Sequence, residues 1–190
     1  MSSKSSEYDV FAADGPNIAA YAKRGYLTPL TSYLTDEEVS MFTAPMQNEI
    51  RYNGEIYGAA MGDSSLVMYY NTDLLEQAGI TYDFSALSGD NRITWEELVD
   101  IAKQVQSKLD PDGSQGLIGI EFQQVGRTYQ MNVLANDLGG KNIADGGLSV
   151  DGIINAEPWT SALNWYQTQV NDGVFSKGIA AGDTSSYFMS

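Results

Sequence analysis

Cysteine and histidine are both absent from this sequence of 190 residues. Without cysteine, the chain has no disulfide framework, no thiol nucleophile and no thiolate ligand for a metal. Without histidine, a Ser-His-Asp triad, a histidine general base and an imidazole metal site are excluded as well. Any chemistry must therefore come from carboxylates, hydroxyls, lysine, tyrosine or the backbone.

Basic residues are scarce. Ten Lys and Arg stand against 25 Asp and Glu, which gives a formal net charge of −15 and a pI of about 4.1. A surface of this sign repels phosphate backbones and anionic lipid, so nucleic acid and membrane surfaces are poor candidate partners. The negative charge remains compatible with the binding of neutral ligands and of cations. The sequence also lacks a Gly-rich phosphate-binding motif, so nucleotide chemistry has no support.

Long hydrophobic runs are absent too, since none approaches the roughly 18–20 residues that a membrane span requires. Residues 1–7 are polar and carry no signal-peptide pattern, and we interpret them as a linker or tag-like segment. Two localisations fit: the cytoplasm, or the extracellular space for a chain that lacks its leader. With 43% hydrophobic and 18% charged residues, the chain is expected to fold around a core.

Predicted strands and helices alternate along the chain, which indicates the α/β class. Strands are predicted at Tyr8–Ala13, Leu66–Tyr70 and Leu117–Phe122, and a hairpin turns at Asn53-Gly54 into a strand at Ile56–Ala59. The predicted helices span residues 18–24, 35–47, 72–78, 94–109, 128–138 and 158–170. Two of them begin with capping boxes, Thr35 with Glu38 and Thr94 with Glu97. Asp14 and Asn17 are expected to cap the first helix.

The acidic residues offer two chemical interpretations. A glycosidase needs two facing carboxylates, one with a raised pKa, and no pair here has a spacing that demands this arrangement. Solvated surface carboxylates are therefore the favoured interpretation. The loop Asp110–Gly116 resembles an oxygen-rich calcium loop, but its first Gly is fourth where an EF-hand has it sixth. A loop rich in turns is favoured over a metal site.

Aromatic residues are plentiful, with twelve Tyr, six Phe and three Trp. Tyr and Trp side chains are suited both to stacking on sugar rings and to positions at the edge of a hydrophobic core. Trp95 and Trp165 lie on apolar helix faces and are predicted to be core residues, whereas Trp159 is ambiguous. Tyr129 follows a polar loop where a strand leads into a helix. It is the best candidate for an aromatic ligand contact, with a structural role as the alternative.

Three motifs occur in a distinctive order and spacing: NGEIYG at 53–58, YYNTDLL at 69–75 and TWEE at 94–97. Together they resemble the solute-binding proteins of sugar ABC transporters (family 1, the maltose-binding-protein-like group). The resemblance runs from about Tyr8 to the end of the chain. It implies a type II periplasmic-binding-protein-like fold that is incomplete here, as an internal fragment. Residues 8–62 would form part of the N-terminal lobe and residues 63–190 most of the C-terminal lobe.

The resemblance also implies a function. The chain would take part in capturing a carbohydrate, an oligosaccharide, for an ABC importer, without catalysis, cofactor or metal. Its parent would be extracellular, as a cell-surface lipoprotein or a periplasmic protein, and would meet permease subunits. The ligand-binding residues implied by matching segments are Asp14, Asn17, Asp63, Ser64, Ser65, Arg127 and Tyr129. Maltose specificity is not implied, because Ala13 stands where the maltose-binding member has a Trp.

Two alternatives remain open at this stage. The first is a carboxylate-dependent glycoside hydrolase, which would share the same acids and aromatics. The second is a structural fragment that binds no ligand and self-associates, as a domain-swapped or homodimeric assembly. Uncovered strand edges would drive such an association.

Overall fold

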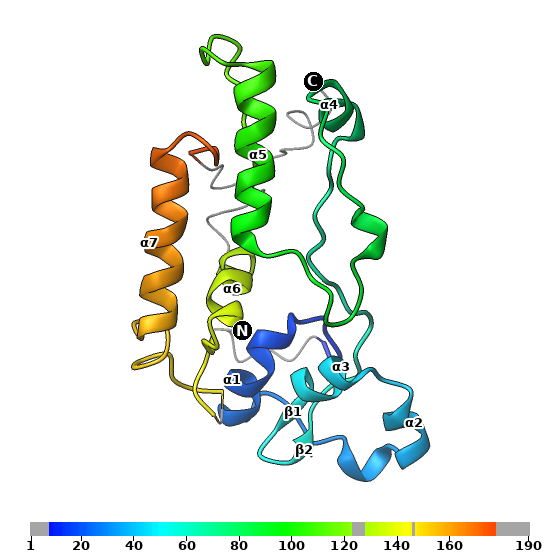
Figure 1. The fold of residues 1–190 in the computed structure, drawn as a ribbon. Helices are drawn as coiled ribbons and strands as arrows, with labels where there is room; N and C mark the ends of the chain where they lie inside the picture. Colours follow the sequence, from blue (N-terminus) through cyan, green and yellow to red (C-terminus); the bar gives the residue numbers. More distant parts are fainter. Residues whose placement is uncertain (1–7, 123–127, 146, 178–190) are drawn as a thin grey trace. The chain divides into compact units, whose positions relative to one another are not determined.

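A computed structural model describes residues 8–122, 128–145 and 147–177 of the chain (Figure 1). The chain divides into two compact units. Unit 1 comprises Met1–Ser65 and Ile143–Ile153, and unit 2 comprises Leu66–Asn142 and Ile154–Ser190. The segment 143–153 therefore belongs to unit 1 although both of its neighbours in the sequence belong to unit 2. No pattern in the sequence predicted that this segment would join unit 1.

Unit 1 consists of short helices and one hairpin. Its elements are η1 (Gly15–Asn17), α1 (Ile18–Lys23), η2 (Thr31–Tyr33), α2 (Asp36–Ser40), α3 (Ala44–Glu49), β1 (Arg51–Tyr52) and β2 (Glu55–Ile56). The predicted hairpin is confirmed, since Asn53 and Gly54 take φ values of 49° and 83°, as a type I′ turn requires. The second strand ends at Ile56, so its predicted extension to Ala59 is wrong.

The helix predicted from Thr35 to Gln47 is two helices. The capping box is confirmed, because Thr35 and Glu38 bond each other's backbone N–H groups at the start of α2. The chain then turns at Thr43, whose hydroxyl accepts from the N–H of Met46 (3.4 Å) and starts α3. Pro45, in the first turn of α3, has no N–H to continue the α2 ladder, and its ring disfavours a helix on its N-terminal side.

Three isoleucines form the small core of unit 1. Ile18 from α1, Ile50 after α3 and Ile56 from β2 are all buried. The hairpin is fixed to its surroundings by backbone bonds: Leu30 N–H donates to Ile56 C=O (2.7 Å) and Tyr57 N–H donates to Ile50 C=O (2.9 Å). The side chains of Ile50 and Ile18 both lie within 4 Å of the position that a Cβ on Gly58 would take, so both flank this glycine.

Unit 2 contains the longer helices. Its elements are α4 (Thr72–Gln77), η3 (Phe84–Ala86), α5 (Trp95–Leu109), α6 (Thr128–Asp137) and α7 (Glu157–Asn171). All four α-helices were predicted, with ends within one residue of those observed. The second capping box is confirmed as well, since the Thr94 hydroxyl accepts from Glu97 N–H (3.1 Å) and Glu97 Oε2 accepts from Thr94 N–H (2.8 Å).

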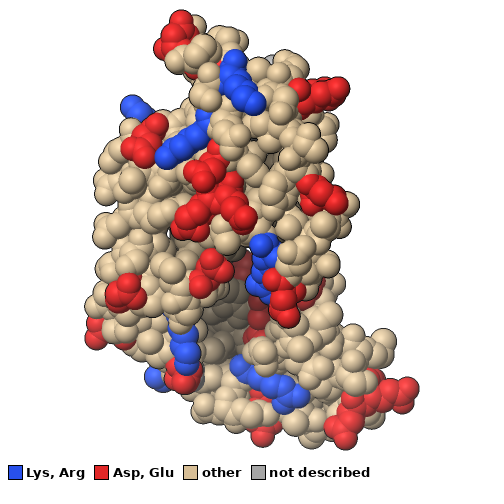
Figure 2. Space-filling model, viewed as in Figure 1, with Lys and Arg blue, Asp and Glu red and all other residues tan. Residues whose placement is uncertain are grey.

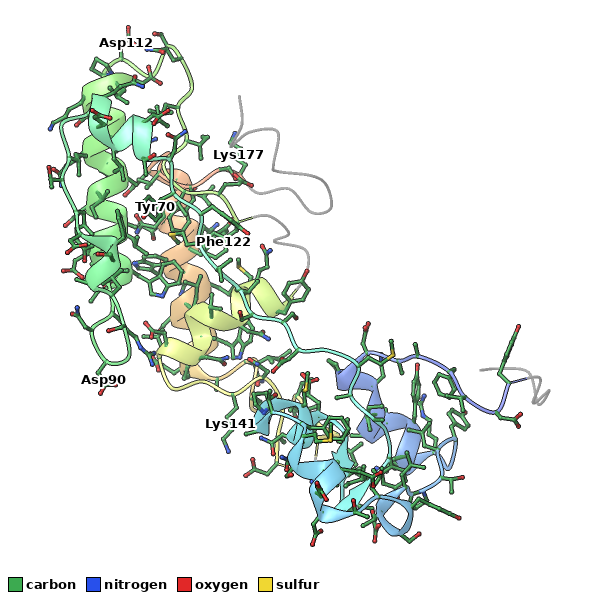
Figure 3. All side chains as sticks on the ribbon, turned by 90° about the vertical axis from the view of Figure 1, so that its right-hand side faces the viewer. Tyr70, Asp90, Asp112, Phe122, Lys141 and Lys177 are labelled. Atoms are coloured by element: carbon green, nitrogen blue, oxygen red, sulfur yellow. The ribbon has the colours of Figure 1, made fainter. Side chains whose placement is uncertain are left out.

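The core of unit 2 is aromatic and centres on Phe122, which is labelled in Figure 3. Its ring lies 6.0 Å from Trp95 of α5, 5.4 Å from Tyr166 of α7 and 5.4 Å from Phe175. Trp95 and Trp165 pack against this core, which confirms the prediction for both. Trp159 is buried, and its indole N–H donates to the C=O of Lys141 (2.8 Å), so this ambiguous residue is structural.

Two predicted strands are wrong, and a third is reduced to one bridge. Tyr8–Ala13 and Leu66–Tyr70 have no ladder among the described residues, and Tyr8 and Val10 are 79% and 87% exposed. Within Leu117–Phe122 there is a single parallel bridge, between Ile120 and Phe175. The β-forming composition of these runs is real, but a strand also requires a neighbour to pair with. The described part is accordingly rich in helix, with one two-stranded sheet.

Candidate functional site

The loop that precedes α1 presents two of the predicted ligand-binding side chains. Asn17 N–H donates to the C=O of Asp14 (3.0 Å), which closes the turn of η1. Neither side chain caps a helix, so the predicted capping role of Asp14 and Asn17 is wrong. Both residues are exposed, and the carboxylate and the carboxamide are therefore available to a ligand.

Glu49 lies against this loop and was missed by the sequence analysis. A Cβ atom on Gly15 would lie 2.6 Å from Glu49 Oε2 and 3.1 Å from Glu49 Cβ. Gly15 therefore permits the end of α3 to approach the loop. The fold places the carboxylate of Glu49 beside the turn that carries Asp14, and this makes the loop acidic. No sequence pattern signals a contact between residues this far apart in the chain.

The predicted segment 63–65 is held in unit 1 by a side-chain bond. Thr43 Oγ1 donates to Asp63 Oδ2 (3.0 Å), and Ser64 N–H donates to Asp63 Oδ1 (2.9 Å). Ser64 and Ser65 are exposed. Thr43 was recognised by neither motif nor spacing, yet it fixes the position of the Asp63 carboxylate.

Unit 2 carries a further predicted residue, Tyr129. Tyr129 lies in the first turn of α6 with 44% of its surface exposed, which leaves much of the ring accessible. Arg127 lies outside the described residues. Of the six predicted site residues that the structure describes, five belong to unit 1 and one, Tyr129, belongs to unit 2. Within unit 1, bonds join Asp14 to Asn17 and Asp63 to Ser64.

Several carboxyl groups have a lowered pKa, and all of these serve local structure. The pKa of Glu38 and of Glu97 is lowered by hydrogen bonds from the backbone and then the hydroxyl of a capping Thr. The pKa of Asp83 and of Asp112 is lowered chiefly by the hydroxyl of a serine two residues later. The general acid of a glycosidase requires a raised pKa instead. These four groups are therefore unsuited to that role.

The Asp110–Gly116 loop is built around a buried carboxylate. Asp110 accepts at both oxygens, from Gln115 N–H (3.0 Å) and from Leu117 N–H (2.9 Å). Asp112 lies at the tip of this loop, beyond the end of α5 (Figure 3). The Asp110 carboxylate thus stabilises the turns of this loop, in agreement with the predicted loop rich in turns. In the described ranges, no group of three or more Asp, Glu, His and Cys side chains is placed to hold a metal ion.

A search of the helices in the described part found none with the length and apolar character needed to cross a bilayer.

Comparison with known proteins places the chain in a family. The sequence model of the bacterial extracellular solute-binding proteins matches residues 1–188. The chain therefore belongs to this family, and the resemblance inferred from the three motifs is confirmed. The family implies a type II periplasmic-binding fold.

Individual relatives are more distant. A protein of Brucella abortus (strain 2308), named only as a binding protein, is 26% identical over 162 residues, which are 85% of this chain and 36% of that protein. A Brucella suis binding protein matches to the same extent. A lactose-binding protein of Rhizobium radiobacter is 31% identical over 104 residues, or 50% of this chain and 23% of that protein. The chain thus spans about a third of the length of the Brucella relatives.

Proposed function

We propose that this chain is part of the carbohydrate-capturing component of an ABC importer, and that it performs no catalysis. The match to the solute-binding family over residues 1–188 carries this proposal. The name of the lactose-binding relative adds support for a sugar, and an oligosaccharide is the ligand class we propose. The permease subunits of the importer would be its protein partners. The parent protein would be extracellular, as a cell-surface lipoprotein or in the periplasm.

The two compact units follow the proposed division into lobes except at residues 63–65 and Ile143–Ile153, which belong to unit 1. We assign residues 8–62 to part of the N-terminal lobe and residues 63–190 to most of the C-terminal lobe of a type II fold. In proteins that clamp a ligand between two lobes, each lobe contributes contacts and a hinge closes them.

The exposed side chains suit a neutral, hydroxyl-rich ligand. In unit 1, Asp14 and Asp63 offer acceptors, and Ser64 and Ser65 offer hydroxyls that both donate and accept. Tyr129 offers an apolar face for the C–H side of a sugar ring, and Arg127 would donate to hydroxyls. Acidic side chains also outnumber basic ones over the face drawn in Figure 2, which disfavours an anionic ligand.

Calorimetric titration of the chain with lactose and with maltose tests the proposal. We expect saturable binding of at least one sugar, and no release of nitrophenol when the chain is incubated with nitrophenyl glycosides. A flat titration with both sugars and with an oligosaccharide panel would contradict carbohydrate capture. Turnover of a glycoside would instead establish the hydrolase alternative, which no feature of the described structure specifically favours.

A second candidate, self-association, has its own structural support. Leu66, Val67 and Met68 are 44%, 68% and 46% exposed, and no hydrogen bond between described residues involves their backbone. This neutral segment in a strongly acidic chain is suited to pairing with the same segment of a second copy. A concentration-dependent dimer in analytical ultracentrifugation, abolished by Val67→Lys, would support it. A monomer at all concentrations would contradict it.

A further inference from the structure

Glu121 of unit 2 carries a buried oxygen that has no hydrogen-bond donor. Its Oε1 atom is buried, and no group of the described residues bonds to it. Glu121 also has no ion-pair partner there, since the salt bridge found joins Lys103 to Asp172. A buried acceptor without a donor lowers the stability of a folded protein, and a carboxylate costs more than a neutral group. Such a group therefore requires an explanation.

The position of Glu121 supplies a reason. It follows Ile120, whose parallel bridge to Phe175 is extended by the bond from Ser176 N–H to Ile120 C=O (3.3 Å). Glu121 thus lies at the carboxyl end of a parallel segment. In α/β proteins, ligands bind beyond the carboxyl ends of parallel strands. The residue after it, Phe122, is buried in the aromatic core and anchors the backbone beside Glu121.

The negative charge of Glu121 affects the pKa of Tyr166, a residue of α7. Burial, and then the negative charge of Glu121, raise the pKa of the Tyr166 hydroxyl above its ordinary value of 10.0. Tyr166 packs on Phe122 and Phe175 through its ring. The carboxylate therefore stands at the margin of the aromatic core, beside a partly buried phenol, with one oxygen exposed to neither water nor a donor.

We propose that Glu121 is a ligand-binding residue: its Oε1 is closed to solvent in the ligand-free fold, and binding of the neutral sugar ligand opens this position so that Oε1 accepts a hydrogen bond from a sugar hydroxyl. This inference rests on the proposed carbohydrate-capturing function and adds a residue that no motif identified. A hydroxyl donor supplies the missing partner without introducing a second negative charge. A carboxylate acceptor makes a shorter and stronger bond with a hydroxyl than a neutral acceptor does.

The proposal predicts that stability and affinity change in opposite directions. Glu121→Met has similar length and no acceptor, so it removes the unsatisfied oxygen from the ligand-free protein and the ligand bond from the complex. We expect the Tm of the ligand-free protein to rise by about 2–4 °C. We expect the sugar affinity to fall about tenfold or more. Glu121→Gln keeps the Oε1 acceptor but loses the charge, and its affinity should lie between those of the wild type and Glu121→Met.

A matched control comes from α7. Gln169 also has a buried Oε1 without a donor, and its backbone C=O accepts from Val174 and Phe175. Gln169→Met removes a comparable defect at a residue that the proposal does not assign to the ligand. It should raise the Tm and leave the sugar affinity unchanged.

Calorimetric titration with lactose and maltose, together with thermal melts without sugar, decides the matter for wild type, Glu121→Met, Glu121→Gln and Gln169→Met. Unchanged affinity in Glu121→Met, with a wild type that binds sugar, would overturn this inference alone. A fall in both Tm and affinity would also overturn it, because Glu121 would then be structural. A wild type that binds none of the sugars would overturn the proposed function, and the inference with it.

Discussion

Thr43 Oγ1 donates a hydrogen bond to Asp63 Oδ2 at 3.0 Å, and the same hydroxyl accepts from Met46 N–H at the start of α3. One side chain thus begins a helix and holds the carboxylate of a predicted ligand-binding residue. Asp63 belongs to an exposed segment with no helix or strand of its own. Its orientation therefore depends on Thr43.

Thr43→Ala should weaken both stability and ligand binding. Loss of the N-cap of α3 is expected to lower the free energy of unfolding by about 1 kcal/mol. Loss of the bond to Asp63 leaves that carboxylate free to turn away, so the sugar affinity should fall as well. Chemical denaturation and calorimetric titration measure the two effects separately.

Thr35→Ala is the control for this prediction. Thr35 caps α2 in the same way but bonds only within its capping box. It should show a similar loss of stability with unchanged sugar affinity. Equal affinities for the two variants would show that Thr43 does not position a binding group.

Tyr129→Ala should reduce sugar affinity about tenfold, because the exposed part of the ring would cover an apolar face of the sugar. Tyr33→Ala removes a more exposed tyrosine, 76% accessible, that belongs to no predicted site. If calorimetric titration gives the same affinity for both variants, Tyr129 is not a ligand contact.

Features governed by nearby residues were predictable from the sequence. The capping boxes at Thr35 and Thr94 and the Asn53-Gly54 turn are each specified by residues within four positions of one another, and all three are present. The periodicity that predicted Trp95 as a core residue is equally local. Such signals depend on backbone geometry that neighbouring side chains determine.

Features governed by distant residues were not predictable. The run Tyr8–Ala13 has strand composition but no partner among the described residues, and pairing is not encoded in the run itself. The approach of Glu49 to Gly15 and the bond from Thr43 to Asp63 also join residues that only the tertiary fold brings together. The unsatisfied oxygen of Glu121 follows from burial, which no spacing in the sequence specifies.

The capping box of α5 should contribute to the pH dependence of stability. Hydrogen bonds from the backbone and hydroxyl of Thr94 lower the pKa of Glu97 from its usual 4.5, so its contribution is fully present above pH 4.5. The contribution is lost as the pH falls through the lowered pKa. Glu97→Gln should therefore lose less stability than wild type on acidification below pH 4.5.

Denaturation at a series of pH values measures how the free energy of unfolding changes with pH. Glu96→Gln is the control, because Glu96 bears no bond to Thr94. Identical acid profiles for the two variants would contradict the role of Glu97.

Gly119→Ala should destabilise unit 2, because Gly119 is packed where no side chain fits. An added Cβ would lie 2.9 Å from Ala102 Cβ of α5 and 3.0 Å from the C=O of Val174. That C=O accepts from the N–H groups of Gly119 and Ile120, so relief of the clash would stretch both bonds. Overpacking of this kind costs about 1–3 kcal/mol.

Gly62→Ala is the matched control, since nothing lies within 4 Å of its added Cβ, and it should change the free energy of unfolding by less than about 1 kcal/mol. Urea denaturation of the two variants compares them directly, and equal midpoints would show that α5 does not pack against the parallel segment as closely as the structure indicates.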